Sequence, residues 1–377
     1  MTSTPVFQTP FAELSLERRP HQPNAPLQAF DAADEYLLNE LAECATLDAQ
    51  QRILVLNDTF GALACALSGH AHITSCGDSY LAYQALQDNL QHNQRADVTF
   101  IPAGQAWSGS FDCVLIRVPK TLALLEEQLI QLQGHIHANT RILAAGMVKH
   151  LPRSSGDLFE RYIGSVQASL AVKKARVLRI SVEPRERAQS PYPTTYQLDS
   201  PKLRLINHAN VFSRDGLDIG TRFLLPLLKQ LPEKARVADL GCGNGVLALA
   251  YGLLHPEAQL TLVDESFMAV QSAEENWQHA FPGRPVICRA DDGLAQQARA
   301  PLDLILCNPP FHQQQVVGEF LAWRMFQQAH AALTSQGELW IVANRHLGYS
   351  DKLKRLFAAV ETVATNPKFV VLRARKR

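Results

Sequence analysis

The chain of 377 residues is 46% hydrophobic and 19% charged, and its 36 Lys and Arg residues balance 36 Asp and Glu residues. A chain of this length favours two domains over one, each able to bury its own core. The formal net charge of zero excludes a general basic field that would hold nucleic acid, so any contact with phosphate must come from local patches.

Seven cysteines are scattered singly along the chain, without a Cys-x-x-Cys pair. This pattern is typical of reduced thiols in a cytoplasmic protein and predicts neither a zinc site nor a disulfide framework. The N-terminus has no basic-then-apolar leader, and no uncharged apolar run approaches the roughly 18 residues that a membrane span needs. We therefore expect a soluble, cytoplasmic, monomeric protein that binds no metal and no membrane.

The first half of the chain opens its regular pattern at residues 52–66, which predict an apolar strand, a turn and a helix. Residues 78–92 predict a second helix, and residues 111–116 predict another short apolar strand. Farther along, a basic patch contains Lys173, Lys174, Arg176, Arg179, Arg185 and Arg187. This patch is a candidate contact with RNA phosphates, and its alternative interpretation is solvated surface charge.

A linker is expected between residues 183 and 201, where four prolines interrupt any helix. The segment 190–195 is also polar, and we place the domain boundary at about residue 190. The two predicted domains are therefore residues 1–190 and residues 191–377.

The second half repeats the order of elements of the first. Its predicted elements are a strand, turn and helix at 236–250, a strand at 259–264, a helix at 266–279, and strands at 285–289, 302–307, 338–343 and 368–373. Asn89 and His92 of the first half lie in step with Asn276 and His279. Strands alternating with helices predict parallel strands with crossover helices, hence doubly wound sheets. The fold class is α/β, with two tandem Rossmann-like domains from an internal duplication.

A glycine-rich turn at residues 239–245 follows the first strand of the second half and opens a helix. Its glycines, with Asn244 between the last two, let the backbone turn sharply and approach a ligand; they are Gly241, Gly243 and Gly245. Such a turn alone is a weak signal, because dinucleotide enzymes also use one. Asp239, which precedes the glycines, favours a cofactor other than a dinucleotide. A carboxylate there would attract a ligand's ammonium group and repel a pyrophosphate.

Two further acids lie at the ends of the next strands. Asp264 is placed to accept two ribose hydroxyls, and Asp292 to accept from an adenine amino group. Each acid alone has an alternative interpretation as a turn or N-cap residue. Together they predict a cationic, adenosine-containing ligand without phosphates, and S-adenosylmethionine is such a ligand.

The segment Asn308, Pro309, Pro310, Phe311 follows the fourth strand, where a Rossmann-type crevice opens. An amine conjugated to an aromatic ring is a poor nucleophile, since its lone pair is delocalised. The Asn308 oxygen and a backbone carbonyl at Pro309 are suited to accept its two N–H bonds and aim the lone pair at a sulfonium methyl, in a geometry that the prolines hold. Phe311 is expected to stack on a flipped or single-stranded base. His312 is a candidate substrate contact.

Residues 207–222 precede the first strand of the second half and contain Gly216 and Gly220. We interpret them either as a loop folding over the cofactor, with Gly220 against it, or as a linker. Residues 344–346 are interpreted as an edge of the site or as a cap.

The first half lacks the residues that are predicted to bind the cofactor in the second half. Val55 stands where the second half has Asp239, Asn57 and Thr59 replace two turn glycines, and Gly77 replaces Asp264. Residues 117–119 stand where the second half has 308–310. The first domain is therefore predicted to be degenerate and not to bind the cofactor.

These segments resemble a known family. Residues 211–220, 239–245, 307–312 and 342–346 are similar to motifs of the bacterial ribosomal RNA guanine-N2 methyltransferases. Residues 31–38, 56–58 and 118–125 resemble more narrowly the enzymes of that family that act on the large subunit. The resemblance covers essentially the whole chain. It implies S-adenosylmethionine as cofactor, guanine N2 of 23S ribosomal RNA as target, as naked RNA or in an assembling subunit, and an N-terminal domain that helps to hold RNA.

Three functions remain open from the sequence. The first is the RNA guanine-N2 enzyme, on the large or on the small (16S) subunit RNA. The second is a protein glutamine or DNA adenine methyltransferase, because those enzymes share the asparagine-proline-proline motif. The third is an RNA clamp that turns nothing over, which the intact Asp239, Asp264 and Asn308 argue against.

Overall fold

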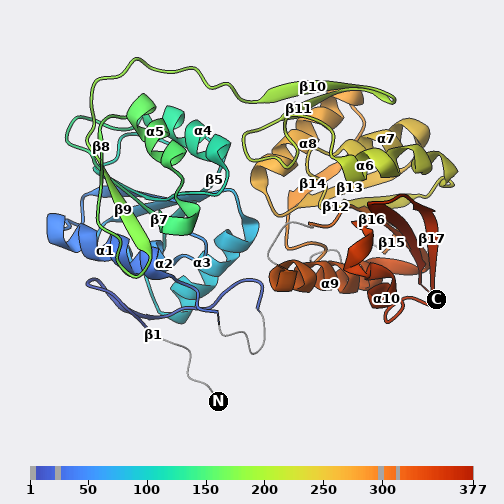
Figure 1. The fold of residues 1–377 in the computed structure, drawn as a ribbon, viewed down its shortest axis with the longest axis horizontal. Helices are drawn as coiled ribbons and strands as arrows, with labels where there is room; N and C mark the ends of the chain where they lie inside the picture. Colours follow the sequence, from blue (N-terminus) through green and yellow to red (C-terminus); the bar gives the residue numbers. More distant parts are fainter. Residues whose placement is uncertain (1–5, 22–26, 296–300, 311–314, 377) are drawn as a thin grey trace. The chain divides into compact units, whose positions relative to one another are not determined.

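The computed structural model describes residues 6–21, 27–295, 301–310 and 315–376. The chain divides into two compact units, Met1–Tyr192 and Pro193–Arg377, drawn in blue to green and in yellow-green to red in Figure 1. Within the described residues no helix has the length and apolar character needed to cross a membrane. All seven cysteines carry free thiols.

The first unit is built around a seven-stranded sheet of order β5-β4-β3-β6-β7-β9-β8. Its elements are β1 (Val6–Gln8), β2 (Glu13–Ser15), α1 (Ala32–Cys44), β3 (Arg52–Leu56), α2 (Ala62–Leu67), β4 (His72–Gly77), α3 (Tyr80–His92), β5 (Thr99–Pro102), β6 (Cys113–Arg117), α4 (Leu122–Leu132), β7 (Arg141–Met147), α5 (Arg153–Tyr162), β8 (Val166–Ala168) and β9 (Ala175–Ile180).

The second unit has a sheet of the same design, in the order β14-β13-β12-β15-β16-β18-β17. Its elements are β10 (Thr194–Asp199), β11 (Lys202–Asn207), α6 (Ile219–Leu224), β12 (Arg236–Leu240), α7 (Val246–Leu254), β13 (Gln259–Asp264), α8 (Phe267–Ala280), β14 (Ile287–Ala290), β15 (Leu302–Cys307), α9 (Gln315–Ala332), β16 (Leu333–Asn344), α10 (Tyr349–Leu353), β17 (Ala359–Thr365) and β18 (Phe369–Arg375).

Both sheets are covered on both faces, as the runs of apolar residues in their strands predict. In β3, Ile53 and Val55 belong to one hydrophobic cluster, whereas Leu54 and Leu56 belong to another, because successive side chains point to opposite faces. All four side chains are fully buried. Burying such a side chain stabilises the fold by about 1.5–3 kcal/mol, so each central strand ties two helical layers together.

The expectation of purely parallel strands needs one correction in each unit. β18 runs antiparallel to both of its neighbours, β16 and β17, and β9 does the same between β7 and β8. In the second unit β17 and β18 are joined by a short turn at residues 366–368. The Asn366 Oδ1 atom accepts hydrogen bonds there from the backbone N–H groups of Lys368 and Phe369. A turn this short joins antiparallel strands only.

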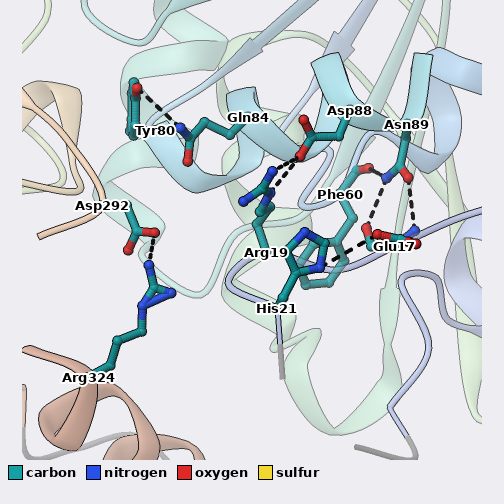
Figure 2. Close-up of polar contacts among 10 residues, drawn as sticks. All are labelled: Glu17, Arg19, His21, Phe60, Tyr80, Gln84, Asp88, Asn89, Asp292 and Arg324. Atoms are coloured by element: carbon teal, nitrogen blue, oxygen red, sulfur yellow. Dashed lines mark hydrogen bonds and ion pairs between the residues drawn. The ribbon is translucent and has the colours of Figure 1, made fainter. Parts of the chain in front are cut away.

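The internal duplication is confirmed down to single hydrogen bonds. Gly61 and Gly245 are both N-caps with φ of 79° and 81°. Asn276 binds the carbonyl of Asn244 in the glycine-rich turn at 3.0 Å, and Asn89 binds the equivalent carbonyl of Phe60 at 2.8 Å (Figure 2). Each asparagine also fixes an upstream strand or loop segment through a further pair of backbone hydrogen bonds.

The segment expected as a linker, residues 183–201, is in part a strand. β10 begins at Thr194 and pairs antiparallel with β11 along its full length. Its partly buried side chains Tyr196 and Leu198 pack against a core cluster of the second unit. The prolines exclude a helix here, but a two-stranded ribbon tolerates prolines at its ends.

Candidate active site

Three strand ends meet at one edge of the second sheet. β12 lies between β13 and β15, all three are parallel, and Asp239, Asp264 and Asn308 therefore come together at their carboxyl ends. Gly243 follows β12 with φ of 53° and has no atom within 4 Å of the place where a Cβ would stand. At Gly245 a Cβ would lie only 3.0 Å from Leu262. The glycines thus serve two needs, open space at the turn and close packing of α7 on the sheet.

Asp239 is buried with half of its carboxylate unused. One oxygen accepts from the backbone N–H of Ala248 at 3.0 Å. The other is buried and has no hydrogen-bond partner among the described residues. Burial raises the pKa of this carboxyl to about 8. A buried acceptor without a donor is costly, so this oxygen is suited to a cationic ligand.

Asp264 holds the glycine-rich turn in place. Its two oxygens accept from the backbone N–H groups of Gly243 at 2.9 Å and Ser266 at 3.0 Å. Burial raises the pKa of this carboxyl as well. Each oxygen keeps a second lone pair, because a carboxylate offers about four acceptor positions. The sequence expectation that Asp264 accepts ribose hydroxyls is therefore compatible with its role in the turn.

Asp292 lies beyond β14 and forms an ion pair with an arginine side chain. Its carboxylate forms an ion pair with Arg324 of α9 (Figure 2). Its backbone carbonyl accepts from the Gln328 side chain at 2.8 Å. The sequence predicted an acid aimed at an adenine amino group and gave no sign of Arg324. In the structure the arginine already takes up acceptor capacity of this acid.

Two residues expected to contact the cofactor have internal roles. The Asn244 side chain donates to the Tyr196 hydroxyl at 3.0 Å and to the Asn207 side chain at 2.8 Å, inside a buried polar network. Gly220 lies in the first turn of α6, where a Cβ would stand 3.1 Å from an oxygen of Asp218. Gly220 therefore leaves room for the carboxylate that caps this helix.

Asn308 is clamped by two residues that sequence reasoning did not single out. Its amide nitrogen donates to Oδ2 of Asp218 and to Oγ1 of Thr221, both at 2.9 Å. Its amide oxygen is buried and has no partner within the described part of the chain. Pro309 is buried and Pro310 is exposed. The predicted substrate contacts Phe311 and His312 lie outside the described residues.

Asp218 and Thr221 belong to the segment 207–222, which was interpreted as a lid or a linker. Asp218 is the N-cap of α6, since its Oδ2 accepts from the backbone N–H of Thr221 at 2.8 Å. Aspartate is a common N-cap residue, but the sequence predicted no helix in this segment. Such a signal can give the start of a helix, but not the contact with Asn308.

Three of the six basic residues are engaged within the first unit, and one of them is Arg185, whose guanidinium lies 2.8 Å from the Glu183 carboxylate. The Lys173 ammonium lies 2.8 Å from Glu35, and Arg179 binds Glu40 through two hydrogen bonds of 2.6 and 2.8 Å. Lys174 is exposed and Arg176 is half-buried on β9. The six residues therefore do not form one patch of unpaired charge.

The comparisons with known proteins agree with this geometry. Residues 4–184 match the family model "RLMG N-terminal domain", and residues 202–373 match "Methyltransferase small domain". Over 99% of this chain and 100% of theirs, it is 65% identical to the ribosomal RNA large subunit methyltransferase G of Ectopseudomonas mendocina and 63% identical to that of Pseudomonas aeruginosa.

The chain belongs to the ribosomal RNA large subunit methyltransferase G family. Its fold is also that of a 16S rRNA guanine-N2 methyltransferase of T. thermophilus, solved in complex with AdoMet and guanosine. The two share 20% sequence identity and a TM-score of 0.78, over 99% of this chain and 98% of the other.

In this family member, an ion-pair cluster fills the corresponding edge of the first sheet. The sheet registers place Arg117 where the second unit has Asn308. Arg117 donates two hydrogen bonds of 2.9 Å to Asp31, and its Nε lies 3.4 Å from Asp34. Burial raises the pKa of Asp34 to about 7. A guanidinium only donates, so this edge offers no acceptor at the position of the Asn308 oxygen.

The turn of the first unit is closed by side chains as well. Asn57, in place of Gly241, takes a left-handed φ of 63° and exchanges two hydrogen bonds of 2.9 Å with the Gln128 amide. Asp58 accepts from the backbone N–H of Ala64 at 2.9 Å in the first turn of α2, as Asp239 accepts from the backbone N–H of Ala248 in α7. The carboxylate that accepts from this backbone N–H thus stands at different positions of the two turns, and the first unit has Val55 where the second has Asp239.

We expect one cofactor molecule to bind per chain, at the second unit. Calorimetric titration of the full-length protein with S-adenosylmethionine measures this directly. The variant Asp239→Asn serves as a control, because weakened binding at the second unit should leave no other site to titrate. A stoichiometry of two in the native protein would contradict the expectation.

Proposed function

We propose that this protein transfers a methyl group from S-adenosylmethionine to the exocyclic N2 amine of a guanine in 23S ribosomal RNA. Membership of the large-subunit methyltransferase family supports RNA as the substrate. The observation that carries the chemistry is the buried amide oxygen of Asn308, which has no hydrogen-bond partner within the described residues.

The target amine needs acceptors more than it needs a base. Its lone pair is delocalised into the guanine ring, and accepting its N–H bonds restores electron density at nitrogen. The Asn308 oxygen is placed at a strand end to take one of these bonds, and the rigid Pro309–Pro310 backbone fixes its position. S-Adenosylmethionine supplies an activated methyl group, so this chain has only to bind, orient and exclude water.

The residues at the edge of the sheet fit this cofactor. Asp239 offers a buried oxygen for the ammonium group, which needs a strong acceptor when it leaves water. Asp264 offers two oxygens at the end of the next strand for the ribose hydroxyls. Asp292, with its partner Arg324, is the candidate for the adenine edge. The backbone of the glycine-rich turn, at Gly241 and Gly243, provides close approach.

Competing substrates are separated by one assay. Labelled S-adenosylmethionine is incubated with the full-length protein and 23S RNA, 16S RNA, DNA or release-factor protein in turn. Incorporation into 23S RNA, followed by mass mapping to a guanine N2, supports the proposal. Incorporation into 16S RNA, DNA adenine or a protein glutamine instead would refute it. We further propose that the protein acts in the cytoplasm as a monomer and uses no metal. Its substrate is either naked RNA or an assembling ribosomal subunit.

The first unit, in this proposal, holds RNA and catalyses nothing. Three exposed lysines support this role: Lys120 after β6, Lys149 after β7, and Lys174 before β9. The backbone N–H of Val148 donates to the carbonyl of Lys174 at 2.8 Å, so two of these segments lie together. Desolvation and then the charges of Lys149 and Lys120 lower the pKa of His150, so both ammonium groups act on this imidazole. Within the described residues, none of the three lysines forms an ion pair.

Replacing Lys120, Lys149 and Lys174 together with alanine should weaken RNA binding and lower its salt dependence. Each lost phosphate contact removes about 0.7–0.9 from the slope of log K against log salt, so the slope should fall by about 2 to 3. Fluorescence anisotropy with labelled 23S fragments measures both quantities. Lys173→Ala is the matched control, because Glu35 already engages that ammonium. An unchanged slope in the triple variant would leave the first unit only a shielding role.

A further inference from the structure

We propose that Asp218 and Thr221 are positioning residues that fix the orientation of the Asn308 amide and strengthen its oxygen as an acceptor. The inference rests on the proposed function, since it assigns these residues to the same methyl transfer. It starts from the two 2.9 Å hydrogen bonds that join the Asn308 nitrogen to Asp218 and Thr221.

The orientation of the amide follows from chemistry. A carboxylate has acceptors only, so the group of Asn308 that faces Asp218 must be its NH2. If the amide were reversed, its oxygen would meet the Asp218 carboxylate, and its NH2 would face the target amine. Both contacts would then be repulsive. The pair Asp218 and Thr221 therefore decides whether Asn308 presents an acceptor or a donor to the substrate.

The same contacts affect the strength of the oxygen. Hydrogen bonds in a low-dielectric interior polarise one another. When the amide nitrogen donates to a carboxylate, electron density moves toward the amide oxygen. That oxygen is buried and has no partner among the described residues, so the gain is available to a substrate N–H.

The first unit separates architecture from function. There, Asp31 is the N-cap of α1, and it binds Arg117 at the end of β6 with Asp34 three residues further on. A link from a helix N-cap to the strand end therefore exists in both units. Only in the second unit does the strand-end residue keep an unused acceptor. The link from the helix N-cap to the strand end is thus a structural feature that both units share. The orientation of an amide by this link is specific to Asn308.

The matched pair Thr221→Val and Thr221→Ser tests the orienting part. Valine removes the hydroxyl with nearly the same shape, whereas serine keeps it. We expect the single-turnover rate to fall about tenfold in Thr221→Val and to stay near that of the native protein in Thr221→Ser. Affinities for S-adenosylmethionine and for RNA should change less than about twofold in both. Thermal unfolding with and without the cofactor monitors the fold.

A charge exchange tests the contact between Asp218 and Asn308. Asn308→Asp opposes two carboxylates and should remove nearly all activity. Adding Asp218→Asn supplies an amide donor to the new carboxylate, while asparagine still caps α6. The double variant should recover at least about tenfold in single-turnover rate over Asn308→Asp alone, and thermal unfolding of both variants separates this gain from a recovered fold. If Thr221→Val does not fold, the comparison of Asn308→Asp with the double variant tests the inference alone.

A rate like that of the native protein in Thr221→Val, or no recovery in the double variant, would overturn the inference. Failure of the proposed function looks different. In that case the native protein methylates another amine, and the same variants are compared on that substrate. The role of Asp218 and Thr221 is then tested on that substrate, apart from the identity of the target in the proposed function.

Discussion

Replacing Asn308 with alanine should lower the rate of methyl transfer by about a hundred- to a thousandfold, the range for removing one preorganised group at a reacting centre. The loss should appear in the chemical step, because Asn308 acts on the target amine and not on the cofactor. The fold should survive, since Asp218 still accepts from the backbone N–H of Thr221 and α6 keeps its cap.

Single-turnover assays with 23S RNA measure the rate, and calorimetry measures cofactor affinity, which should change less than about threefold. Asp264→Ala is the contrasting variant. It should weaken cofactor binding, because it removes the ribose acceptors and releases the backbone of Gly243. Near-native turnover in Asn308→Ala would rule out the proposed role of the asparagine.

The second large effect is expected at Asp239. Asp239→Asn should weaken S-adenosylmethionine binding by about a hundredfold, the scale for losing one partner of a buried charge pair. The asparagine oxygen can still accept from the backbone N–H of Ala248, and α7 should keep its first turn. The new NH2 then faces the ammonium group, so a donor meets a cation.

The same substitution should alter the pH dependence of stability without cofactor. The pKa of Asp239 is about 8 in the folded protein and near 3.8 when unfolded. Between these values the folded state binds more protons, so this group's contribution to stability falls as pH rises from about 4 to 8. Asp239→Asn removes that contribution and should raise the unfolding midpoint at pH 8 by a few degrees more than at pH 5.

Cofactor affinity gives a second readout of this carboxyl. An ammonium group binds the charged carboxylate, so binding below pH 7.5 should release a proton and tighten about twentyfold from pH 6 to 7.5. Calorimetry in two buffers of different ionisation enthalpy measures the proton. Asp239→Asn should release none. Equal proton release in both proteins would contradict the assignment of Asp239 to the ammonium.

Local chemistry made much of the fold predictable. The apolar runs at 236–240 and 302–307 indicated buried parallel strands, and the structure has β12 and β15 there. The glycine at 245 indicated a turn that only a residue with positive φ can make. The repeat of Asn89 and Asn276 indicated duplication, and both side chains bind the carbonyl of the turn in their own unit.

What could not be predicted depends on contacts between residues far apart in sequence. Asp218 and Asn308 are 90 residues apart, so no local pattern joins them. Lys173 and Glu35 are 138 residues apart in the sequence. A cluster of basic residues in the sequence does not reveal that one of its charges is paired with a distant acid. β17 was missed because its residues alternate only weakly between buried and exposed. The prolines at 191–201 correctly excluded a helix, but they concealed the edge strand β10.

The ion-pair cluster of the first unit bears on how a duplicated gene product can change over time. Reversing Arg117 to asparagine alone would strand the buried Asp34 beside Asp31 without their cation, which costs about 3–5 kcal/mol. Placing an acceptor at that edge therefore requires Asp31 and Asp34 to be replaced together with Arg117. The cluster makes the stability of the first unit depend on the residue that stands where the second unit has Asn308, so the two units tolerate different substitutions at the same position of the fold.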